Sequence, residues 1–207
     1  MKSICIITSK YPTIHKPTAL VFVQQLAWTL ADMDIKVTII CPISVNIEGL
    51  KGLQLPYKTN ETTEKNNVIE IYFPKYVGFG QRNFSFFNTA SLSLEGFSIA
   101  AIRVINSLSK KPDVIYGHFI SPSGVVAARI GKKFNIPSFV AYGESSPWSV
   151  ENLGVKKVIK ELKNINGVVA VSTKNKDELI NLGIIDKEKI GVSRMQLGQN
   201  IIIQEIK

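Results

Sequence analysis

The fold is decided by residues 3–42, which read SICIITSKYPTIHKPTALVFVQQLAWTLADMDIKVTIICP. Residues 3–8 form a short, nearly all-apolar run that is typical of a central parallel strand covered on both faces. Apolar residues then recur at helical spacing over about residues 20–33. Residues 36–41 read as a second strand, which Pro42 ends. Strand, helix and strand together predict a βαβ unit.

The same alternation continues to the end of the chain. Residues 42–67 are polar and irregular, and we expect a long excursion there with room for a hairpin. Ser121 and Pro122 are expected to cap and open a helix. Further strands are expected at residues 68–73, 114–117, 136–141 and 167–171, and further helices at about 86–109, 155–165 and 172–183. Six strands and their helices predict an α/β fold, a three-layer, doubly wound parallel sheet in the order 3-2-1-4-5-6.

Composition bounds the class of protein. The chain has 207 residues, 45% of them hydrophobic and 20% charged, which indicates a globular domain or a close pair of domains. It lacks both the roughly 20-residue apolar stretch that spans a bilayer and a secretory signal, so we expect a cytoplasmic protein. Cys5 and Cys41 lie in apolar runs, so we expect buried thiols and neither a disulfide nor a metal site.

The net charge and the aromatic segment each allow more than one interpretation. A net charge of +9 is compatible with nucleic acid, anionic lipid or a phosphorylated ligand, but the basic residues are spread along predicted helices, which favours solvated helix surfaces. We therefore expect no nucleic-acid partner. The segment 72–87 is either core or a peripheral membrane contact. It contains Tyr72, Phe73, Lys75, Tyr76, Phe79, Arg82, Phe84, Phe86 and Phe87.

The expected site follows from the topology. Ligands of such sheets bind beyond the carboxyl ends of the strands, where the strand order reverses. The loops that end there are residues 9–19, 118–123, 142–148 and 172–175. Their polar side chains are candidates for binding an acceptor or a phosphate, namely Lys16, Thr18, His118, Ser121, Ser145 and Ser172.

Two residues of these loops are candidates for catalysis. His118 directly follows a strand and precedes a helix N-terminus, where an anion is favoured, although a hydrogen bond to a neighbouring loop explains it equally well. Glu144 suits a general base or an acceptor for a sugar hydroxyl, and the alternative is a solvent-facing loop glutamate. The dinucleotide and P-loop glycine motifs and the nucleophile elbow are absent, which argues against nicotinamide, nucleotide-hydrolysing and serine-hydrolase chemistry.

Several segments resemble the N-terminal domain of group 1 glycosyltransferases of the GT-B fold. The resemblance begins with residues 9–12, 21–23 and 37–42 and covers nearly the whole chain. Further matches follow in order at residues 112–118, Pro122, Gly124, Ile136, Pro137, Gly143, residues 168–172, Lys174, Leu179, Gly183 and residues 186–192. None of these pieces is specific alone, but their order and spacing together are.

The resemblance implies half of a two-domain enzyme. Residues 1–192 would be the Rossmann-like acceptor-binding domain of a retaining, metal-independent hexosyltransferase without a cofactor, and residues 193–207 would lie near the interdomain linker. The nucleotide-sugar donor would bind mainly to a C-terminal domain that this sequence does not contain. The acceptor would be a cell-surface glycan or a lipid-linked precursor, used at the inner face of the membrane. The alternative is a non-catalytic binding module or a truncated, inactive gene product.

The sequence departs from the family pattern at three places. Leu20 stands where the family commonly has a glycine close to the nucleotide phosphates. Gly143 and Glu144 stand where a histidine or aspartate is frequent, and Ser193 and Arg194 replace an asparagine-glycine pair. The donor-binding pair of glutamates eight positions apart is missing. We therefore expect this chain alone to be catalytically silent.

Overall fold

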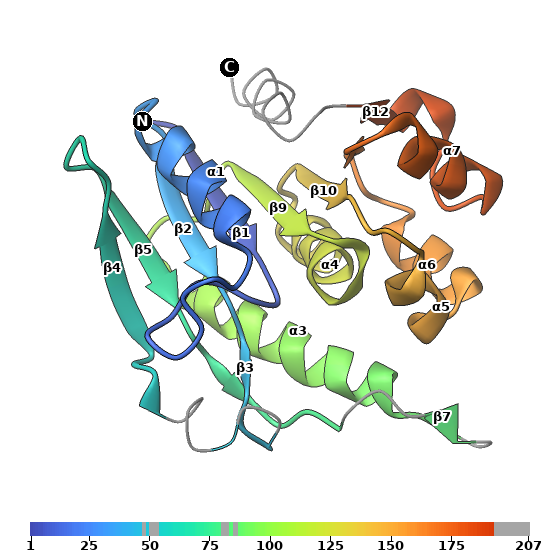
Figure 1. The fold of residues 1–207 in the computed structure, drawn as a ribbon, viewed down its shortest axis with the longest axis horizontal. Coiled ribbons are helices and arrows are strands. Elements are labelled where there is room, and N and C mark those ends of the chain that lie inside the picture. Colours follow the sequence, from blue (N-terminus) through green and yellow to red (C-terminus); the bar gives the residue numbers. More distant parts are fainter. Residues whose placement is uncertain (47–48, 50–53, 80–82, 85–86, 193–207) are drawn as a thin grey trace. The chain divides into compact units, whose positions relative to one another are not determined.

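The computed structural model describes residues 1–46, 49, 54–79, 83–84 and 87–192 (Figure 1). The chain divides into two compact units, residues 1–112 and residues 113–207. The segment 193–207, expected near a linker, lies outside the described residues.

The N-terminal unit is built on four strands in the order β1, β2, β5, β4. β1 (Ser3–Ile7), β2 (Lys36–Ile40) and β5 (Val68–Tyr72) are parallel, as predicted. β4 (Lys58–Thr62) pairs antiparallel with β5. The excursion therefore supplies one strand of a hairpin whose other strand is β5, and the wholly parallel sheet was wrong at this edge.

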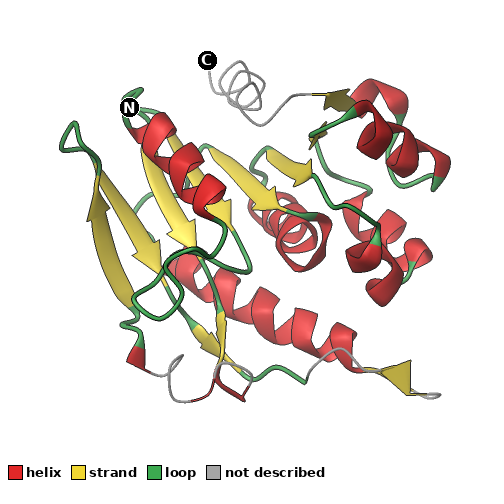
Figure 2. Ribbon diagram, viewed as in Figure 1, coloured by secondary structure: helices red, strands yellow, loops and turns green. Residues whose placement is uncertain are grey.

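Two long helices flank this sheet on opposite sides (Figure 2). α1 (Val21–Ala31) buries Val23, Ala27 and Leu30, which follow one another at helical spacing. α3 (Thr89–Ser107) buries a longer stripe that includes Phe97 and Val104. Both helices lie within a few residues of their predicted bounds. Two small ribbons complete the unit: β3 (Ile43–Ser44) with β6 (Lys75–Tyr76), and β7 (Asn83–Phe84) with β8 (Phe87–Asn88).

The C-terminal unit holds four parallel strands within its described residues 113–192. Their order is β12 (Ile190–Val192), β11 (Gly167–Ala170), β10 (Ser138–Tyr142) and β9 (Val114–His118). The helices are α4 (Val125–Phe134), α5 (Trp148–Leu153), α6 (Val155–Leu162), α7 (Thr173–Asn181) and the short η2 (Lys187–Lys189). β12 and α5 were not predicted, because three and six residues are too few to display a period.

The turn after β9 corrects one prediction. Ser121 and Pro122 do not open a helix, because they lie inside the π-type turn η1 (Ile120–Gly124), where Ser121 is extended, and α4 starts only at Val125 without a side-chain cap. Two glycines explain this geometry. A Cβ on Gly117 would lie 2.6 Å from Cα of Gly124, so only glycine permits the turn to press onto β9.

The burial of side chains tests the predictions for the two cysteines and for part of the aromatic segment 72–87. Cys5 and Cys41 are buried, as expected. Tyr72 and Phe73 belong to the core, being 8% and 3% exposed, so the membrane interpretation was wrong for these two rings. The side chains of residues 84, 86 and 87 lie outside the described part of the structure. Among the described residues, no helix combines the length and the hydrophobicity needed to cross a bilayer.

The mostly parallel sheets with flanking helices confirm the predicted α/β, Rossmann-like fold class. Within the units, the parallel strands follow the predicted orders 3-2-1 and 4-5-6. The carboxyl ends of β9, β10 and β11 consequently lie at one edge of the C-terminal unit.

Candidate functional site

The candidate site is this edge, where three predicted residues lie on neighbouring strands. His118 is the last residue of β9, and Ala141 of β10 lies beside it in the sheet. Glu144 follows the end of β10 by two residues, and Ser172 follows the end of β11 by two residues. Parallel pairing thus brings His118, Glu144 and Ser172 to one edge, as expected from the sequence.

Glu144 is the most unusual side chain of this edge. It is only 7% exposed, although it lies in a loop. Its Oε2 accepts a hydrogen bond of 3.2 Å from the backbone N–H of Ser149, at the start of α5. Its Oε1 is buried and has no hydrogen-bond partner among the described residues. Buried polar atoms are nearly always paired, so this oxygen is available to a ligand or an ordered water.

The ionisation of Glu144 follows from its surroundings. Burial raises the pKa of its carboxyl group above the usual value. The side chain and the backbone N–H of Ser149 oppose this shift by hydrogen bonding, and the nearby Glu178 carboxylate adds a smaller upward shift of the pKa. Such a carboxylate is a better proton acceptor than one in water.

Ser172 and Asn175 hold the Glu144 loop in place. α7 begins where predicted, with Ser172 as its N-cap, and Ser172 Oγ accepts a 3.1 Å hydrogen bond from the backbone N–H of Asn175. The same hydroxyl donates to Oδ1 of Asn175 over 2.7 Å. Asn175 Nδ2 in turn donates to the carbonyl oxygen of Glu144 over 2.8 Å. Ser172 therefore positions Glu144 through Asn175.

His118 lies at the expected edge but is 6% exposed. Its Nδ1 is 3.1 Å from the hydroxyl of Tyr116, two residues earlier on the same strand, and the ring of Phe119 packs against its own ring at 4.5 Å. Burial lowers the pKa of His118 to about 4, so the imidazole is neutral at physiological pH. A neutral imidazole offers a hydrogen bond but no positive charge to an anion.

Other polar groups of this unit extend the candidate site. The hydroxyl of Ser123 is buried and has no partner among the described residues. The hydroxyl of Ser149 is buried close to the Glu144 carboxylate. Ser121 is half-buried and Ser145 is exposed. The hydroxyl of Tyr142 donates a hydrogen bond to the carboxylate of Glu178. Ser149 was not predicted, since nothing in its sequence neighbourhood marks a buried hydroxyl.

Lys16 and Thr18 lie in the loop after β1 in the N-terminal unit, and both are exposed. The loop is folded on itself, because Lys16 N–H donates to the carbonyl of Thr13 over 3.1 Å and Thr13 N–H donates back over 3.2 Å. Beneath it lies a small cavity of about 40 Å³, lined among others by Lys10, His15 and Lys16. Nε2 of His15 is buried without a partner among the described residues.

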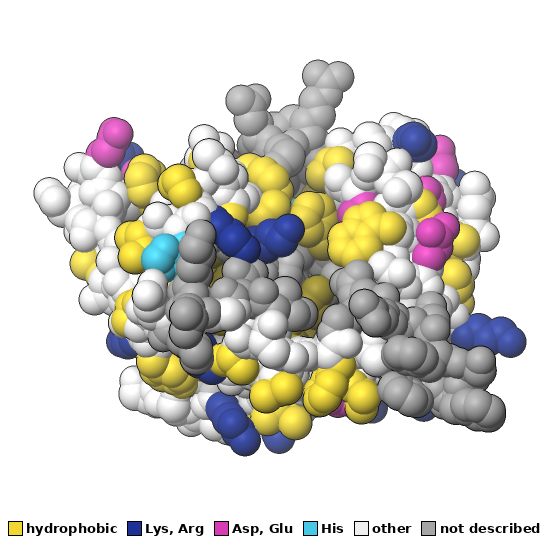
Figure 3. Space-filling view, turned by 60° about the horizontal axis from the view of Figure 1, so that its bottom comes forward, with side chains coloured by type: hydrophobic (Ala, Val, Ile, Leu, Met, Phe, Trp, Pro, Cys, Tyr) yellow, Lys and Arg dark blue, Asp and Glu magenta, His cyan; other side chains and the backbone are white. Residues whose placement is uncertain are grey.

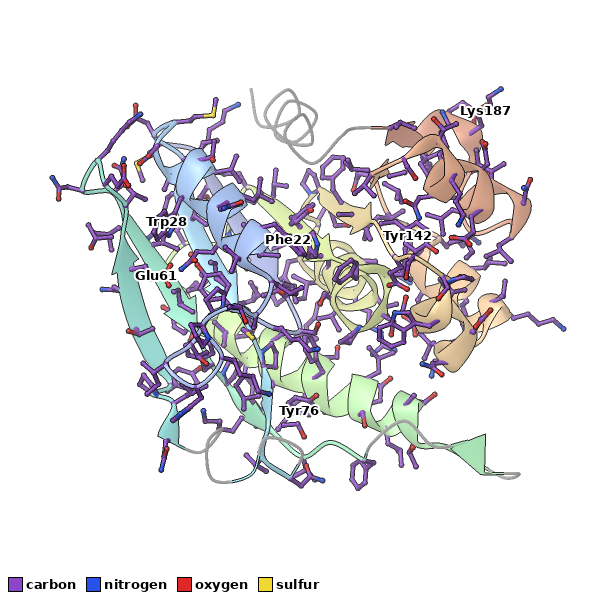
Figure 4. All side chains as sticks on the ribbon, viewed as in Figure 1. Phe22, Trp28, Glu61, Tyr76, Tyr142 and Lys187 are labelled. Carbon is purple, nitrogen blue, oxygen red and sulfur yellow. The ribbon has the colours of Figure 1, made fainter. Side chains whose placement is uncertain are left out.

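Glu61 on β4 is a second carboxylate of interest, and no pattern in the sequence indicated it. It accepts hydrogen bonds from the Tyr11 hydroxyl over 2.8 Å, from Gln24 Nε2 over 3.0 Å and from Trp28 Nε1 over 3.1 Å. Figure 4 shows Trp28 of α1 pointing toward Glu61. Glu61 also borders an open groove of about 520 Å³, with Ile71 and Phe73 among its lining residues.

Comparison with known proteins identifies the family. The model of Glycosyltransferase Family 4 matches residues 19–193. The chain belongs to this family. The resemblance noted in the sequence is thereby confirmed, and the chain is 26% identical over 194 residues to TuaC of Bacillus subtilis (strain 168), named "Putative teichuronic acid biosynthesis glycosyltransferase". That match covers 90% of this chain and 48% of TuaC.

Solved structures share the fold of this glycosyltransferase-family chain. The match to UDP-GlcNAc 2-epimerase of Methanocaldococcus jannaschii covers 99% of this chain and 50% of the epimerase chain, at a TM-score of 0.54 and 16% identity. The match to UGT89C1 of Arabidopsis thaliana, complexed with UDP, covers 92% of this chain and 48% of the UGT89C1 chain, at a TM-score of 0.50 and 12% identity. The chain thus spans about half the length of the proteins it matches.

Proposed function

We propose that residues 1–192 form the acceptor-binding domain of a retaining, metal-independent glycosyltransferase, and that residues 193–207 lie near the linker to a donor-binding domain. The enzyme would transfer a sugar from a nucleotide-sugar to a cell-surface glycan or a lipid-linked precursor. The name of TuaC supports such an acceptor, and UGT89C1, also solved with UDP-L-rhamnose, supports such a donor. The observation that carries the proposal is the unpartnered, buried oxygen of Glu144 at the carboxyl edge of the sheet.

Glu144 is assigned to the acceptor hydroxyl. In the transfer the oxygen of this hydroxyl forms the new glycosidic bond to the anomeric carbon of the donor sugar, while the bond from that carbon to the phosphate oxygen breaks and the nucleotide leaves with the bonding electron pair. The hydroxyl proton passes to the carboxylate, so a carboxylate that accepts its hydrogen bond both orients the oxygen and favours its attack. Oε1 is the free acceptor, while Oε2 is held by Ser149. The raised pKa of Glu144 strengthens that hydrogen bond.

The remaining candidates are assigned to binding. His118, as a neutral imidazole, and the hydroxyls of Ser121 and Ser145 would contact hydroxyl groups of the acceptor. Lys16 would contact a phosphate, and Thr18 would donate a hydrogen bond beside it. Ser172 acts indirectly, because its hydroxyl fixes Asn175, which fixes the Glu144 loop.

The test is turnover of a Glu144→Gln variant of the protein that contains this domain together with its donor-binding domain. Transfer of radiolabelled sugar from a panel of nucleotide-sugars to a membrane extract is measured. We expect kcat to fall by about 10²-fold, a typical effect of removing a positioned acid–base group.

A matched control is Glu151→Gln, since Glu151 is an exposed carboxylate on α5 of the same unit. We expect it to leave kcat unchanged. Equal turnover of the Glu144 and Glu151 variants would remove Glu144 from the mechanism. If the unaltered protein transfers no sugar from any donor, the non-catalytic binding module becomes the better account.

The 207-residue chain by itself is expected to show neither turnover nor tight donor binding. Transfer requires preorganised charges on both sides of the reacting groups, and this sequence lacks the donor-binding glutamate pair. Calorimetry with the same nucleotide-sugars checks this. Donor binding at micromolar or tighter affinity, or measurable transfer, would show that the chain is a complete enzyme.

A further inference from the structure

The N-terminal unit exposes a strip of large apolar side chains. Val77 and Phe79, which follow β6, are 53% and 52% exposed. Leu92 and Ile99, two turns apart on α3, are 45% and 50% exposed. These four residues are called the apolar strip below.

The members of the apolar strip adjoin one another. The backbone N–H of Phe79 donates to Oγ of Ser93, next to Leu92, over 2.8 Å. Gly96 lies between Leu92 and Ile99 on the helix, and a Cβ placed on it would be 3.0 Å from the carbonyl oxygen of Val77. The segment after β6 therefore lies directly against α3, and its apolar side chains continue those of the helix.

The exposure of the apolar strip is built into the fold. Asn46 holds the segment from both sides, because its Oδ1 accepts the N–H of Gly78 over 2.8 Å and its Nδ2 donates to the carbonyl of Gly78. Tyr76 pairs with Ser44 in the β3–β6 ribbon and packs edge-on against Phe97 at 5.7 Å. A strip anchored in this way presents its side chains to solvent in a fixed arrangement.

Neighbouring features match the chemistry of a lipid surface. Arg103 follows Ile99 by one turn and is exposed, and the whole chain carries a net charge of +9. Figure 3 shows hydrophobic side chains gathered along the lower part of its view, with Lys or Arg side chains beside them.

From these features we infer that the apolar strip rests on the surface of a bilayer that contains anionic lipids. Apolar side chains that enter the headgroup region, together with basic residues, are what holds a peripheral protein on such a surface. Glu95, exposed between Leu92 and Ile99, limits the depth of insertion to the interface. This contact brings the chain to a lipid-linked acceptor but does not depend on the transfer chemistry.

The test is flotation of the 207-residue chain with vesicles of phosphatidylcholine alone or with about one third phosphatidylglycerol, at low and high salt. The variant carries Val77→Ser and Phe79→Ser. The matched control is Val68→Ser on β5, because Val68 is 54% exposed but lies outside the apolar strip. Circular dichroism and thermal unfolding check that both variants are folded.

We expect the unaltered chain and the control to float with the anionic vesicles, and salt to weaken this binding. The double variant should bind at least about five-fold more weakly, since it loses two apolar contacts with the interface. No flotation, or equal flotation of the double variant, overturns the inference. A dimer that the double substitution dissociates would also overturn it, because the strip would then face a second copy. The vesicles contain no glycan or nucleotide, so none of these outcomes bears on sugar transfer.

Discussion

Two carboxylates in this molecule have opposite surroundings, although both lie close to loops of a Rossmann-like sheet. Glu61 in the N-terminal unit accepts three hydrogen bonds, from Tyr11, Gln24 and Trp28. Glu144 in the C-terminal unit is more deeply buried, yet one of its oxygens has no partner among the described residues. The difference shows that Glu61 ties β4 to α1 and the first loop, whereas Glu144 is kept free at a cost in stability. A residue that is costly to bury and left unpaired is a candidate for a functional site.

The largest effect expected at the Glu144 edge is the pH dependence due to His118. Its pKa falls to about 4 in the folded chain from an ordinary value of 6.5, so between these values the unfolded chain binds more protons than the folded chain. The stabilising contribution of neutral His118 is therefore complete above about pH 6.5 and is lost as the pH falls toward 4. The full effect corresponds to about 3 kcal/mol.

His118→Asn should flatten that dependence. The free energy of unfolding in urea is measured for the variant and for the unaltered chain at pH 7.5, 6 and 4.5. Glu144 is present in both proteins, so its opposite pH dependence cancels in the difference between them. Parallel pH dependences would mean that His118 is not held neutral, and the edge would then carry a cation beside Glu144.

A smaller effect is expected from the clamp that holds the Glu144 loop. Asn175→Ala removes the hydrogen bonds to the Glu144 carbonyl and to Ser172, and we expect it to lower the free energy of unfolding by about 2 kcal/mol, as for buried hydrogen bonds that lose one partner. Urea unfolding measures this. Asp177→Ala, at an exposed position of the same helix, should change little. An equal loss in both variants would show that Asn175 does not hold Glu144.

The smallest effect concerns Leu20, at the start of α1 in the N-terminal unit. Leu20 has φ 48° and ψ 47°, the left-handed conformation that favours glycine. The resemblance to group 1 glycosyltransferases led us to expect a glycine at this position. Leu20→Gly should therefore be more stable than Leu20→Ala by about 1 kcal/mol, the reverse of the usual order. Thermal unfolding of the two variants decides this. An alanine variant at least as stable as the glycine variant would mean that the backbone relaxes.

The parallel strands could be predicted because their signal is local. Residues 3–8, 36–41 and 167–171 are short apolar runs, and each one forms the core of a strand. Knowing that parallel strands end at one edge was then enough to place His118, Glu144 and Ser172 near each other. The start of a helix at Ser172 and Thr173 could also be predicted from the local sequence.

The surroundings of these residues could not be predicted, because they depend on contacts distant in sequence. Glu61 meets partners 33 to 50 residues away, and Asn175 meets Glu144 across 31 residues. No periodicity reveals such pairs. The burial of Glu144 and its free oxygen depend on α5, a helix of six residues that the sequence pattern does not show. The turn at Ser121 was misread for a similar reason, since the close approach of Gly117 and Gly124 replaces a side-chain cap.

The contrast between the two carboxylates is tested most directly by urea unfolding of Glu61→Gln and Glu144→Gln side by side at pH 8 and pH 4. Glu61→Gln should lower the free energy of unfolding at pH 8 by about 2 kcal/mol, since it disturbs three hydrogen bonds. Because the folded pKa of Glu144 is raised, its carboxylate lowers stability as the pH rises through that pKa. Glu144→Gln should therefore be more stable than the unaltered chain at pH 8, and this gain should shrink at pH 4. Similar losses of stability in both variants at pH 8 would contradict the account, because Glu144 would then be a structural residue like Glu61.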